Sequence, residues 1–317
     1  MIPRGPVLAL DIGGTKIAAA VVSAGADVGP VCRVPTPARD GAAAVVAAVV
    51  AAGRAALLDG AGGQPPALVG IGSAGVIDPV TGTVTHATDA LPGWAGTRLA
   101  QQVAAGLSAP AYAINDVHAH ALGEARYGAG RGQRDVLVVA VGTGVGGALV
   151  RDGAVVVGAH AAAGHVGHVA VAAAAGLVCP CGRTGHLEAL ASGPGIAAAY
   201  ARAVGSTSPG AAPLTGGEVA ALAAGDGPDS AKAREVLETA GRALGQVVGG
   251  LLNVLDPDVV VLTGSVADAG EGWWDAVRAG VAEQAMDLVA STPIVPATAG
   301  SEAALLGAAA HARAAAS

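Results

Sequence analysis

Phenylalanine is absent from this 317-residue sequence, and aromatic residues of all kinds make up only 2% of it. Hydrophobic residues nevertheless account for 52% of the chain, and 50 residues are glycine. Protein interiors are tightly packed, so a core with few large rings has to be filled by small side chains and closely approaching backbones. The length leaves room for two domains of ordinary size with a substantial core.

Charged residues make up only 13% of the chain, and 17 basic against 24 acidic residues give a net charge of −7. No basic cluster is present, whereas binding to a phosphate backbone depends on concentrated lysine and arginine. No uncharged apolar run reaches the roughly 18 residues that a membrane helix needs, since Arg54 interrupts the most apolar stretch, residues 41–58. A strand is predicted within a few residues of the N-terminus, which leaves no signal peptide. We expect a soluble, cytoplasmic protein that binds neither nucleic acid nor membrane.

Only three residues are cysteine, which suits a reducing compartment. Cys179 and Cys181 are one residue apart, and a disulfide across that spacing would be strained. His168 precedes Cys179 by eleven positions, and His186 follows Cys181 by five. Either histidine alone could be a packed core residue in this segment rich in alanine, valine and glycine. Four nitrogen and sulfur ligands together favour a closed, tetrahedral zinc site that staples the loop.

An apolar strand is predicted at residues 7–12, followed by a glycine turn and a second apolar run at residues 17–22. A β-hairpin is favoured, because the turn lacks the glycine spacing and the Gly-Lys-Ser/Thr ending of strand-to-helix nucleotide motifs. We expect the glycines to allow positive φ and the N–H groups of the turn to face phosphate oxygens. A Gly-Gly turn without a ligand is the alternative. The turn consists of Gly13, Gly14, Thr15 and Lys16.

Residues 135–150 repeat this design as strand, glycine-threonine turn and strand. The second turn contains Thr143, Gly144 and Gly146. A nucleotide with a triphosphate tail needs donors from two sides, so two facing hairpins are far more specific than one. A buried strand predicted at residues 258–265 ends in Gly-Ser.

A short strand predicted at residues 109–116 ends on Asn115 and Asp116 and leads into a helix at residues 117–127. At the end of a strand, the Asp116 carboxylate could accept the proton of an attacking hydroxyl group. The alternative is that Asp116 only caps the helix, which aspartate does readily. From this motif alone the helix cap is the favoured interpretation.

These motifs resemble, in kind and order, those of the ROK family (repressors, open reading frames and sugar kinases) over nearly the whole chain. The family signature has Glu-x-Gly-His ahead of Cys-x-Cys-Gly-x-x-Gly-Cys-x-Glu. Here His165 stands for the leading glutamate and His186 for the last cysteine. Imidazole substitutes for thiolate in tetrahedral zinc sites, so His186 still allows zinc. The Asn-Leu-Pro-Gly-Trp motif of the family begins here with Ala90, which removes one expected contact with a sugar hydroxyl.

The resemblance implies an α/β fold of two ribonuclease H-like lobes, as in actin/hexokinase-type ATPases, with an interlobe cleft. Residues 1–116 would form a small N-terminal α/β lobe, and the C-terminal helix at residues 298–317 would pack back on it. Residues 117–297 would form the large α/β lobe with the zinc-binding loop. The resemblance also implies a homo-oligomer, either a dimer or a tetramer.

The implied reaction is transfer of the γ-phosphoryl group of ATP to a hexose, with Asp116 as general base and Mg²⁺ bridging the phosphates. Asp11 would hold that ion through water, whereas the zinc would be structural. The implied nucleotide contacts are Asp11, Gly13, Gly14, Thr15, Lys16, Thr143, Gly144, Gly146, Gly264 and Ser265. The implied sugar contacts are Gly75, Asn115, Asp116, His165, His168 and Glu188, and the implied zinc ligands are His168, Cys179, Cys181 and His186.

The identity of the sugar depends on His165. Its surroundings, Gly-His-Val-Gly-His, resemble the Gly-His-Ile-Gly-His of bacterial N-acetylmannosamine kinases. Imidazole can donate to the carbonyl of a 2-acetamido group, which a carboxylate would repel. We expect 6-phosphorylation of N-acetylmannosamine, with a glucokinase or broad hexose kinase as the alternative. A repressor would need a helix-turn-helix domain before Asp11, where only ten residues stand, and retention of Asp116 and both hairpins disfavours a non-catalytic sugar-binding protein.

Overall fold

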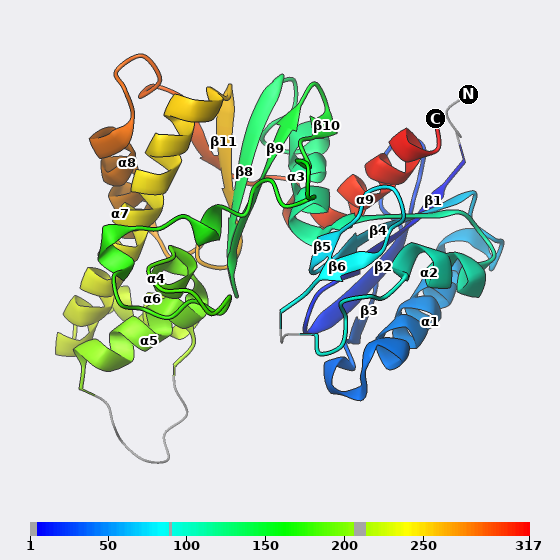
Figure 1. Ribbon diagram of the computed structural model, residues 1–317, viewed down its shortest axis with the longest axis horizontal. Coiled ribbons are helices and arrows are strands. Elements are labelled where there is room, and N and C mark those ends of the chain that lie inside the picture. Colours follow the sequence, from blue (N-terminus) through cyan, green and yellow to red (C-terminus); the bar gives the residue numbers. More distant parts are fainter. Residues whose placement is uncertain (1–4, 89–90, 206–213) are drawn as a thin grey trace. The chain divides into compact units, whose positions relative to one another are not determined.

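The computed structural model describes residues 5–88, 91–205 and 214–317, so Ala90 lies outside the described residues. The chain forms two compact units (Figure 1). Unit 1 consists of Met1–Gln133, Ala148–Ala163 and Ala297–Ser317, and unit 2 consists of Arg134–Gly147 and Gly164–Pro296.

Unit 1 is built on a five-stranded sheet. Its strands are β1 (Val7–Ile12), β2 (Lys16–Val22), β3 (Cys32–Pro35), β4 (Leu68–Ser73) and β7 (Ala111–Asn115), in the order β3-β2-β1-β4-β7. β1 and β2 pair antiparallel, as expected for the first hairpin, and β4 and β7 continue the sheet in parallel. A separate small sheet pairs β5 (Val76–Ile77) with β6 (Val84–His86).

Helices cover both faces of this sheet (Figure 1). They are α1 (Ala42–Ala61), α2 (Leu99–Leu107), α3 (Asp116–Tyr127) and α9 (Ala303–Ala315), with short 3₁₀ turns η1 (Ala38–Asp40) and η4 (Gly300–Glu302). Leu8, Leu10 and Ile12 of β1 pack with α1 and α2, whereas Val7 and Ala9 pack with α9. This alternation follows from the two-residue period of a strand, and it explains why β1 is apolar throughout its buried positions.

Small residues allow the elements of unit 1 to approach through their backbones. A Cβ atom on Gly123 of α3 or on Gly307 of α9 would overlap a backbone carbonyl of the opposite helix. Gly70 of β4 lies equally close to the carbonyl oxygen of Ala308. The close backbone approach expected from the scarcity of large side chains is therefore confirmed in this unit.

Unit 2 carries most of the second five-stranded sheet. The strands are β8 (Asp135–Val141), β9 (Val145–Arg151), β10 (Ala154–Val155), β11 (Val259–Thr263) and β12 (Ile294–Pro296), in the order β10-β9-β8-β11-β12. β8 and β9 are neighbours and form the second predicted strand-turn-strand. β9 starts in unit 2, but its residues from Ala148 onward and β10 are counted with unit 1.

The helices of unit 2 are mostly consecutive in the chain. They are α4 (Glu188–Ala191), α5 (Gly193–Ala203), α6 (Gly216–Ala223), α7 (Pro228–Leu255) and α8 (Glu271–Gln284), with 3₁₀ turns η2 (Val166–His168) and η3 (Ala172–Ala174). α7 and α8 pack closely, because Gly245 and Gly280 each face the backbone of the other helix. Their buried residues join β8 and β11 in one core that includes Trp273.

The boundary between the two units differs from the boundary expected from the sequence, which lay after residue 116. α3 and the residues up to Gln133, expected in the second lobe, belong to unit 1. The physical reason is that α3 packs along α9 through the glycine contacts described above. α9 in turn lies against β4 and β1.

α1 is the one helix among the described residues that is long and apolar enough to cross a membrane, judged by length and composition alone. Its buried residues, among them Val45 and Val49, pack in the core of unit 1. Arg54 of the same helix donates a hydrogen bond to the Gly106 carbonyl oxygen at 2.8 Å. Helices that cover one face of a sheet in globular proteins pass the same test, so it is weak evidence for a membrane span.

His311 on α9 makes unit 1 sensitive to acid. Burial lowers its pKa from 6.5 to about 4, against the opposing effect of a hydrogen bond to the backbone of Ala113. Between pH 6.5 and 4 the folded protein therefore keeps His311 neutral, whereas the unfolded chain protonates it. Stability should be complete above pH 6.5 and decrease as the pH falls through this window.

We predict that His311 removes up to about 3 kcal/mol of unfolding free energy between pH 6.5 and 4, from about 1.4 kcal/mol per pKa unit. His311→Gln, which can keep a hydrogen bond to the Ala113 backbone, should have a correspondingly flatter stability profile. Urea unfolding at a series of pH values measures the difference, with the exposed His160 replaced by Gln as the control. Equal pH slopes for wild type and His311→Gln would contradict the prediction.

Candidate active site and metal centre

The ends of three parallel strands bring the candidate catalytic residues of unit 1 together. Asp11 of β1 is in register with Gly72 of β4, and the next residue, Ser73, is in register with Asn115 of β7. A Cβ atom on Gly72 would lie 3.8 Å from Asp11 Oδ1 and 3.7 Å from Asp116 Cα. The tightest contact of that atom would be with Ala119 Cβ of α3, at 3.0 Å, so glycine at this position lets α3 approach β4. Asp11 and Asp116 both lie near the same point.

Asn115, and not Asp116, provides the side-chain cap of α3. Its Oδ1 accepts a hydrogen bond from the His118 N–H at 3.1 Å, which is the usual N-cap contact. Its Nδ2 donates to the Gly75 carbonyl oxygen at 2.9 Å and to Asp116 Oδ1 at 2.8 Å. The same Asp116 oxygen accepts the Val117 N–H at 2.9 Å. Asn115 thus orients both the Asp116 carboxylate and the glycine loop after β4.

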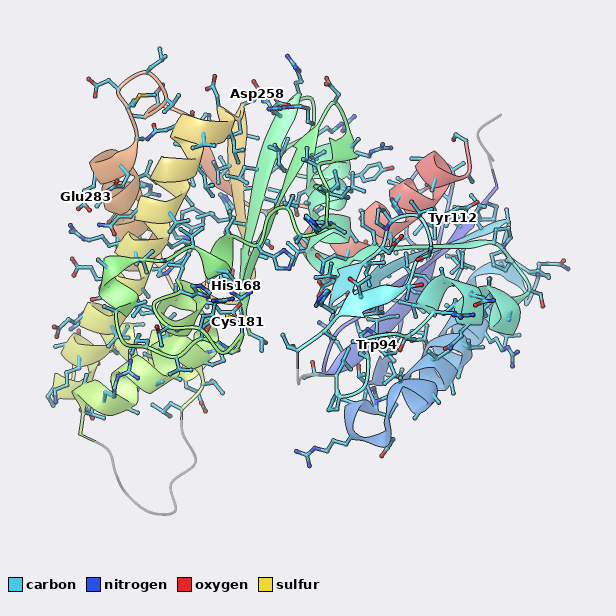
Figure 2. The ribbon with its side chains drawn as sticks, viewed as in Figure 1. Trp94, Tyr112, His168, Cys181, Asp258 and Glu283 are labelled. Atoms are coloured by element: carbon cyan, nitrogen blue, oxygen red, sulfur yellow. The ribbon has the colours of Figure 1, made fainter. Side chains whose placement is uncertain are left out.

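Trp94 is a buried side chain that holds the glycine loop after β4. Its side chain is 1% exposed, and Nε1 donates to Ser73 Oγ and to the Ala74 carbonyl oxygen, each at 3.2 Å (Figure 2). Gly75 has φ of 100°, and a Cβ atom there would lie 2.7 Å from the His86 carbonyl oxygen. The sequence indicated Trp94 only as part of a motif. Its being one of three tryptophans in the chain was the available signal for a structural role.

The electrostatics of this strand edge are unfavourable for a carboxylate. Burial raises the pKa of Asp11 to about 6, and the charge of Asp116 adds to the rise, whereas Lys16 lowers it. A costly buried charge of this kind is frequent at functional sites. A cation bound nearby would remove that cost, and Mg²⁺ prefers oxygen ligands of this type.

The first glycine turn is closed by hydrogen bonds from two sides. The Gly13 N–H donates to the Lys16 carbonyl oxygen at 3.0 Å. Thr36, which follows β3, donates its hydroxyl to the Gly13 carbonyl oxygen at 2.8 Å and its N–H to the Thr15 carbonyl oxygen at 3.0 Å. Neither Gly13 nor Gly14 has a positive φ, so the turn does not use the left-handed conformation that glycine allows. Thr36 was missed because only the pairing of β2 with β3 brings it to the turn.

The second glycine turn is held by residues far along the chain. The Gly142 carbonyl oxygen accepts the Gly193 N–H at 2.8 Å, and Glu188 Oε2 accepts the Val145 N–H at 2.8 Å. Thr143, at the tip of the turn, is exposed. The backbone of the turn is therefore fixed while its tip faces outward.

Gly264 and Ser265 lie beside this second turn. They follow β11, which runs parallel to β8. Gly264 has φ of 94°, and a Cβ atom there would overlap the Val141 backbone. The Val266 N–H donates to the Val141 carbonyl oxygen at 3.0 Å, and a Cβ atom on Gly142 would lie 3.9 Å from Ser265 Oγ. The candidate nucleotide residues of unit 2 are thus brought together at the ends of two parallel strands.

The start of α5 is a neighbour of the second turn that the sequence did not single out. Ser192 caps this helix by accepting the Gly195 N–H at 3.1 Å, and Pro194 lies in its first turn. Serine followed by proline at the first positions is a known helix-start signal, so the sequence contained this information.

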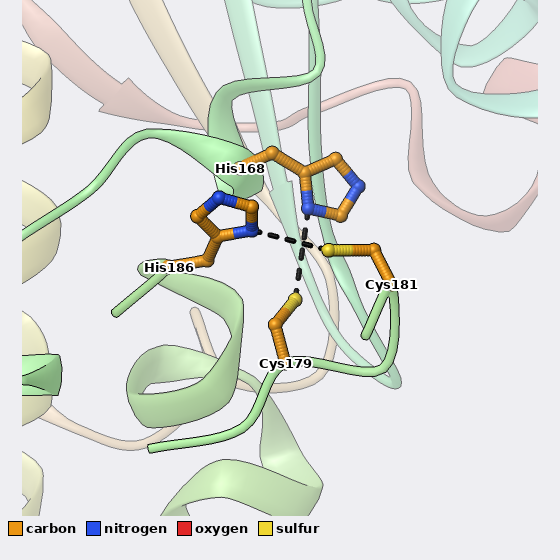
Figure 3. Close-up of side chains that lie close together, drawn as sticks. All are labelled: His168, Cys179, Cys181 and His186. Atoms are coloured by element: carbon orange, nitrogen blue, oxygen red, sulfur yellow. Dashed lines mark hydrogen bonds between the residues drawn. The ribbon is translucent and has the colours of Figure 1, made fainter. Parts of the chain in front are cut away.

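The four candidate zinc ligands converge in unit 2. One ligand atom from each lies within 4.8 Å of the others (Figure 3). His168 Nδ1 is 3.7 Å from Cys179 Sγ, and His186 Nδ1 is 3.2 Å from Cys181 Sγ. Tetrahedral zinc with its usual bond lengths holds nitrogen and sulfur ligands about 3.6 Å apart. The donor set therefore fits a zinc ion.

Local pairing of the loop with itself produces this convergence. Isolated bridges join Ala170 to His186 and Val178 to Thr184. Burial raises the pKa of Cys179 to about 11 in the metal-free protein, and burial lowers the pKa of His168. Zinc binding must displace the thiol protons, so metal affinity will increase with pH.

Comparison with known proteins gives one family. A family model described as "ROK family" matches residues 7–315. A glucokinase of Halalkalibacterium halodurans is 32% identical over 269 residues, covering 83% of this chain and 81% of the relative. An N-acetylmannosamine kinase of Shigella boydii is 33% identical over 285 residues, covering 87% and 88%. The crystal structure of a Streptomyces griseus ROK family glucokinase in complex with glucose and AMPPNP is 29% identical, with a TM-score of 0.82 and coverage of 98% of this chain and 100% of that one.

The fold and the paired glycine turns define the class as an α/β protein of the actin and hexokinase ATPase type, which confirms the expected fold class. The chain belongs to the ROK family.

We predict that Asp11→Asn raises the free energy of unfolding at pH 7 by up to about 3 kcal/mol, because ionised Asp11 is costly in the folded state. The folded pKa of about 6 lies above the ordinary 3.8, so wild type loses this stability as the pH rises from 4 to 6. The gain of the variant should therefore disappear near pH 4. Urea unfolding measures it, with the exposed Asp59 of α1 replaced by Asn as the control. A variant that is no more stable at pH 7 would show that Asp11 is not strained.

We predict that His186→Ala loses most of the bound zinc, because a three-ligand site replaces the closed one. Loss of a residue that only hydrogen-bonds to a ligand lowers the metal affinity about 10- to 100-fold, and loss of a ligand itself should lower it further. Metal analysis of the purified protein, with His160→Ala as the control, measures the metal content. A full complement of zinc in His186→Ala would remove this histidine from the ligand set.

Proposed function

We propose that this protein transfers the γ-phosphoryl group of ATP to the 6-hydroxyl of N-acetylmannosamine. As a ROK sugar kinase it is an ATP:sugar phosphotransferase, and its relatives include proteins named glucokinase and N-acetylmannosamine kinase. The observation that carries the choice of sugar is His165, which occupies the position of the signature glutamate.

Asp116 is the proposed general base. The Asn115 amide and the Val117 N–H both bind Asp116 Oδ1, so the carboxylate is oriented before a substrate arrives. Asp116 would take the proton of the sugar hydroxyl group while the oxygen of that hydroxyl group forms a bond to the γ-phosphorus. The bond from that phosphorus to the bridging oxygen breaks, and ADP leaves. Positioning of this kind, with charge stabilisation, is most of what an enzyme contributes to phosphoryl transfer.

The two glycine turns are the proposed phosphate contacts. Backbone N–H groups of Gly14, Thr15 and Lys16 in unit 1 and of Thr143 and Gly144 in unit 2 would bind phosphate oxygens. The N–H groups of Gly13 and Val145 already donate to the Lys16 carbonyl oxygen and to Glu188 Oε2. Gly264 and Ser265 would contact the adenosine. The chemistry that Mg²⁺ would supply, when bound, is neutralisation of the negative charge on the phosphates. Asp11 would hold the ion through water, which is consistent with its raised pKa.

His165 is the proposed selector of the sugar. It is exposed, and its ring stacks on that of His168 with centroids 6.0 Å apart. Because His168 is a proposed metal ligand, the stacked ring has a fixed neighbour. An imidazole N–H could donate to the acetamido carbonyl oxygen, whereas a carboxylate would face that oxygen with like polarity. Gly75, Asn115 and Glu188 would contact the sugar hydroxyls.

The proposed zinc is structural, held by two histidines and two cysteines that leave no open coordination position. We place the enzyme in the cytoplasm, where ATP is available and thiol ligands stay reduced.

The test is ADP release with Mg-ATP against N-acetylmannosamine, N-acetylglucosamine, mannose and glucose. N-acetylmannosamine should have the highest kcat/KM. His165→Glu should lower that value at least tenfold, about the effect of one lost hydrogen bond, and should favour glucose. Asp116→Asn should lower kcat by about 10²- to 10⁴-fold, with Asp59→Asn unaffected. If glucose leads in the wild type, the inference from His165 fails while the kinase assignment remains. If no sugar stimulates ADP release, the proposed reaction is wrong.

A further inference from the structure

We propose that Glu188 is a positioning residue, which fixes the second glycine turn from the metal-binding loop and so controls the affinity for nucleotide phosphates. The inference rests on the proposed function, because that function assigns phosphate binding to this turn. It concerns a different partner of Glu188 from the sugar, namely the backbone of the protein itself.

The Glu188 carboxylate is packed directly on the turn. Its Oε2 accepts the Val145 N–H at 2.8 Å, and a Cβ atom on Gly144 would lie 2.7 Å from the same oxygen. Alanine at position 144 would therefore force this carboxylate to move. A glutamate inserted at this point sets where the backbone of residues 144 and 145 lies.

The metal-binding loop contacts the turn at a second point. Gly167, which precedes the ligand His168, lies so close to Val145 that a Cβ atom there would overlap the Val145 carbonyl oxygen. At a third point, the Gly142 carbonyl oxygen accepts the Gly193 N–H at 2.8 Å. Two of these three supports come from residues 164–188, the segment that contains all four candidate ligands.

The position of Glu188 depends on its neighbours in that loop. His186 lies two residues before it, and Cys179 Sγ lies 3.9 Å from its Oε1. Leu187 is fully buried, and its N–H donates to the Val169 carbonyl oxygen at 2.9 Å. Ligation of His186 and Cys179 would therefore fix the backbone from which Glu188 reaches the turn. Loss of the metal should weaken phosphate binding through this contact.

Glu188 can favour phosphate binding only by holding the turn in position, because its negative charge opposes that binding. A carboxylate beside a phosphate-binding turn repels the phosphate, since like charges in a partly buried site interact strongly. A turn that is fixed in advance loses less conformational freedom when its N–H groups bind a ligand. Glu188→Gln keeps an acceptor oxygen for the Val145 N–H and removes the charge. This variant should bind ADP at least as well as wild type, whereas Glu188→Ala should not.

The experiment is calorimetric titration of the zinc-loaded protein with ADP and, separately, with adenosine, which has no phosphate. We expect Glu188→Ala to weaken ADP binding at least about tenfold, the equivalent of one hydrogen bond to a charged group, and to leave adenosine binding unchanged. Glu188→Gln should bind ADP within about threefold of wild type or more tightly. The matched control is Glu235→Ala, an exposed glutamate of α7 in the same unit. Metal analysis of each variant should show unchanged zinc.

A second variant tests the same contact from the turn. Gly144→Ala should weaken ADP binding, because its methyl group displaces the Glu188 carboxylate. In the Glu188→Ala background the same change should cost less, because the obstacle is gone. Wild-type affinity in Glu188→Ala, equal losses in the Gln and Ala variants, or additive losses in the double variant would each overturn the proposal. A wild type that binds ADP but phosphorylates no sugar would defeat the proposed function alone, and one that binds no ADP would defeat both.

Discussion

The register of β1, β4 and β7 is the constraint on which the candidate chemistry of unit 1 depends. Because the three strands are parallel, their carboxyl ends meet at one edge, where Asp11 and Asn115 lie and where Gly72 lets α3 approach. Burial makes the Asp11 charge costly at neutral pH, and this edge is where the proposed cation and the proposed base would act. Asn115 links the edge to α3 and to the glycine loop with a single side chain.

In unit 2, the position of the second glycine turn also depends on how distant segments pack. Its glycine turn is supported by Glu188, Gly167 and Gly193, none of which is near it in the chain. Glycine residues have two roles in this protein. They let helices cross through their backbones, as at Gly245 and Gly280, and they let a carboxylate enter a turn, as at Gly144. A chain without phenylalanine obtains its cohesion from these close approaches rather than from large rings.

Much of the fold was predictable because its signals are local. The apolar run, glycine turn and apolar run of each hairpin lie within about twenty residues, and so do the four candidate ligands. Contacts between distant segments were not predictable in this way. Thr36 reaches the first turn only through the pairing of β2 with β3, and Trp94 reaches Ser73 only in the folded unit. The boundary between the units also moved, because the packing of α3 on α9 joins residues from opposite ends of the chain.

The sequence by itself determined the fold class, the family, the two glycine turns and the chemical nature of the candidate metal ligands, because each depends on residue types at short spacing. Only the tertiary structure decided which of several neighbouring polar residues makes a given hydrogen bond. It assigned the helix cap to Asn115 and left Asp116 as the residue that this asparagine orients. It also gave Glu188 a backbone partner, since hydrogen bonds between segments 43 residues apart depend on how the loops pack and not on any local pattern.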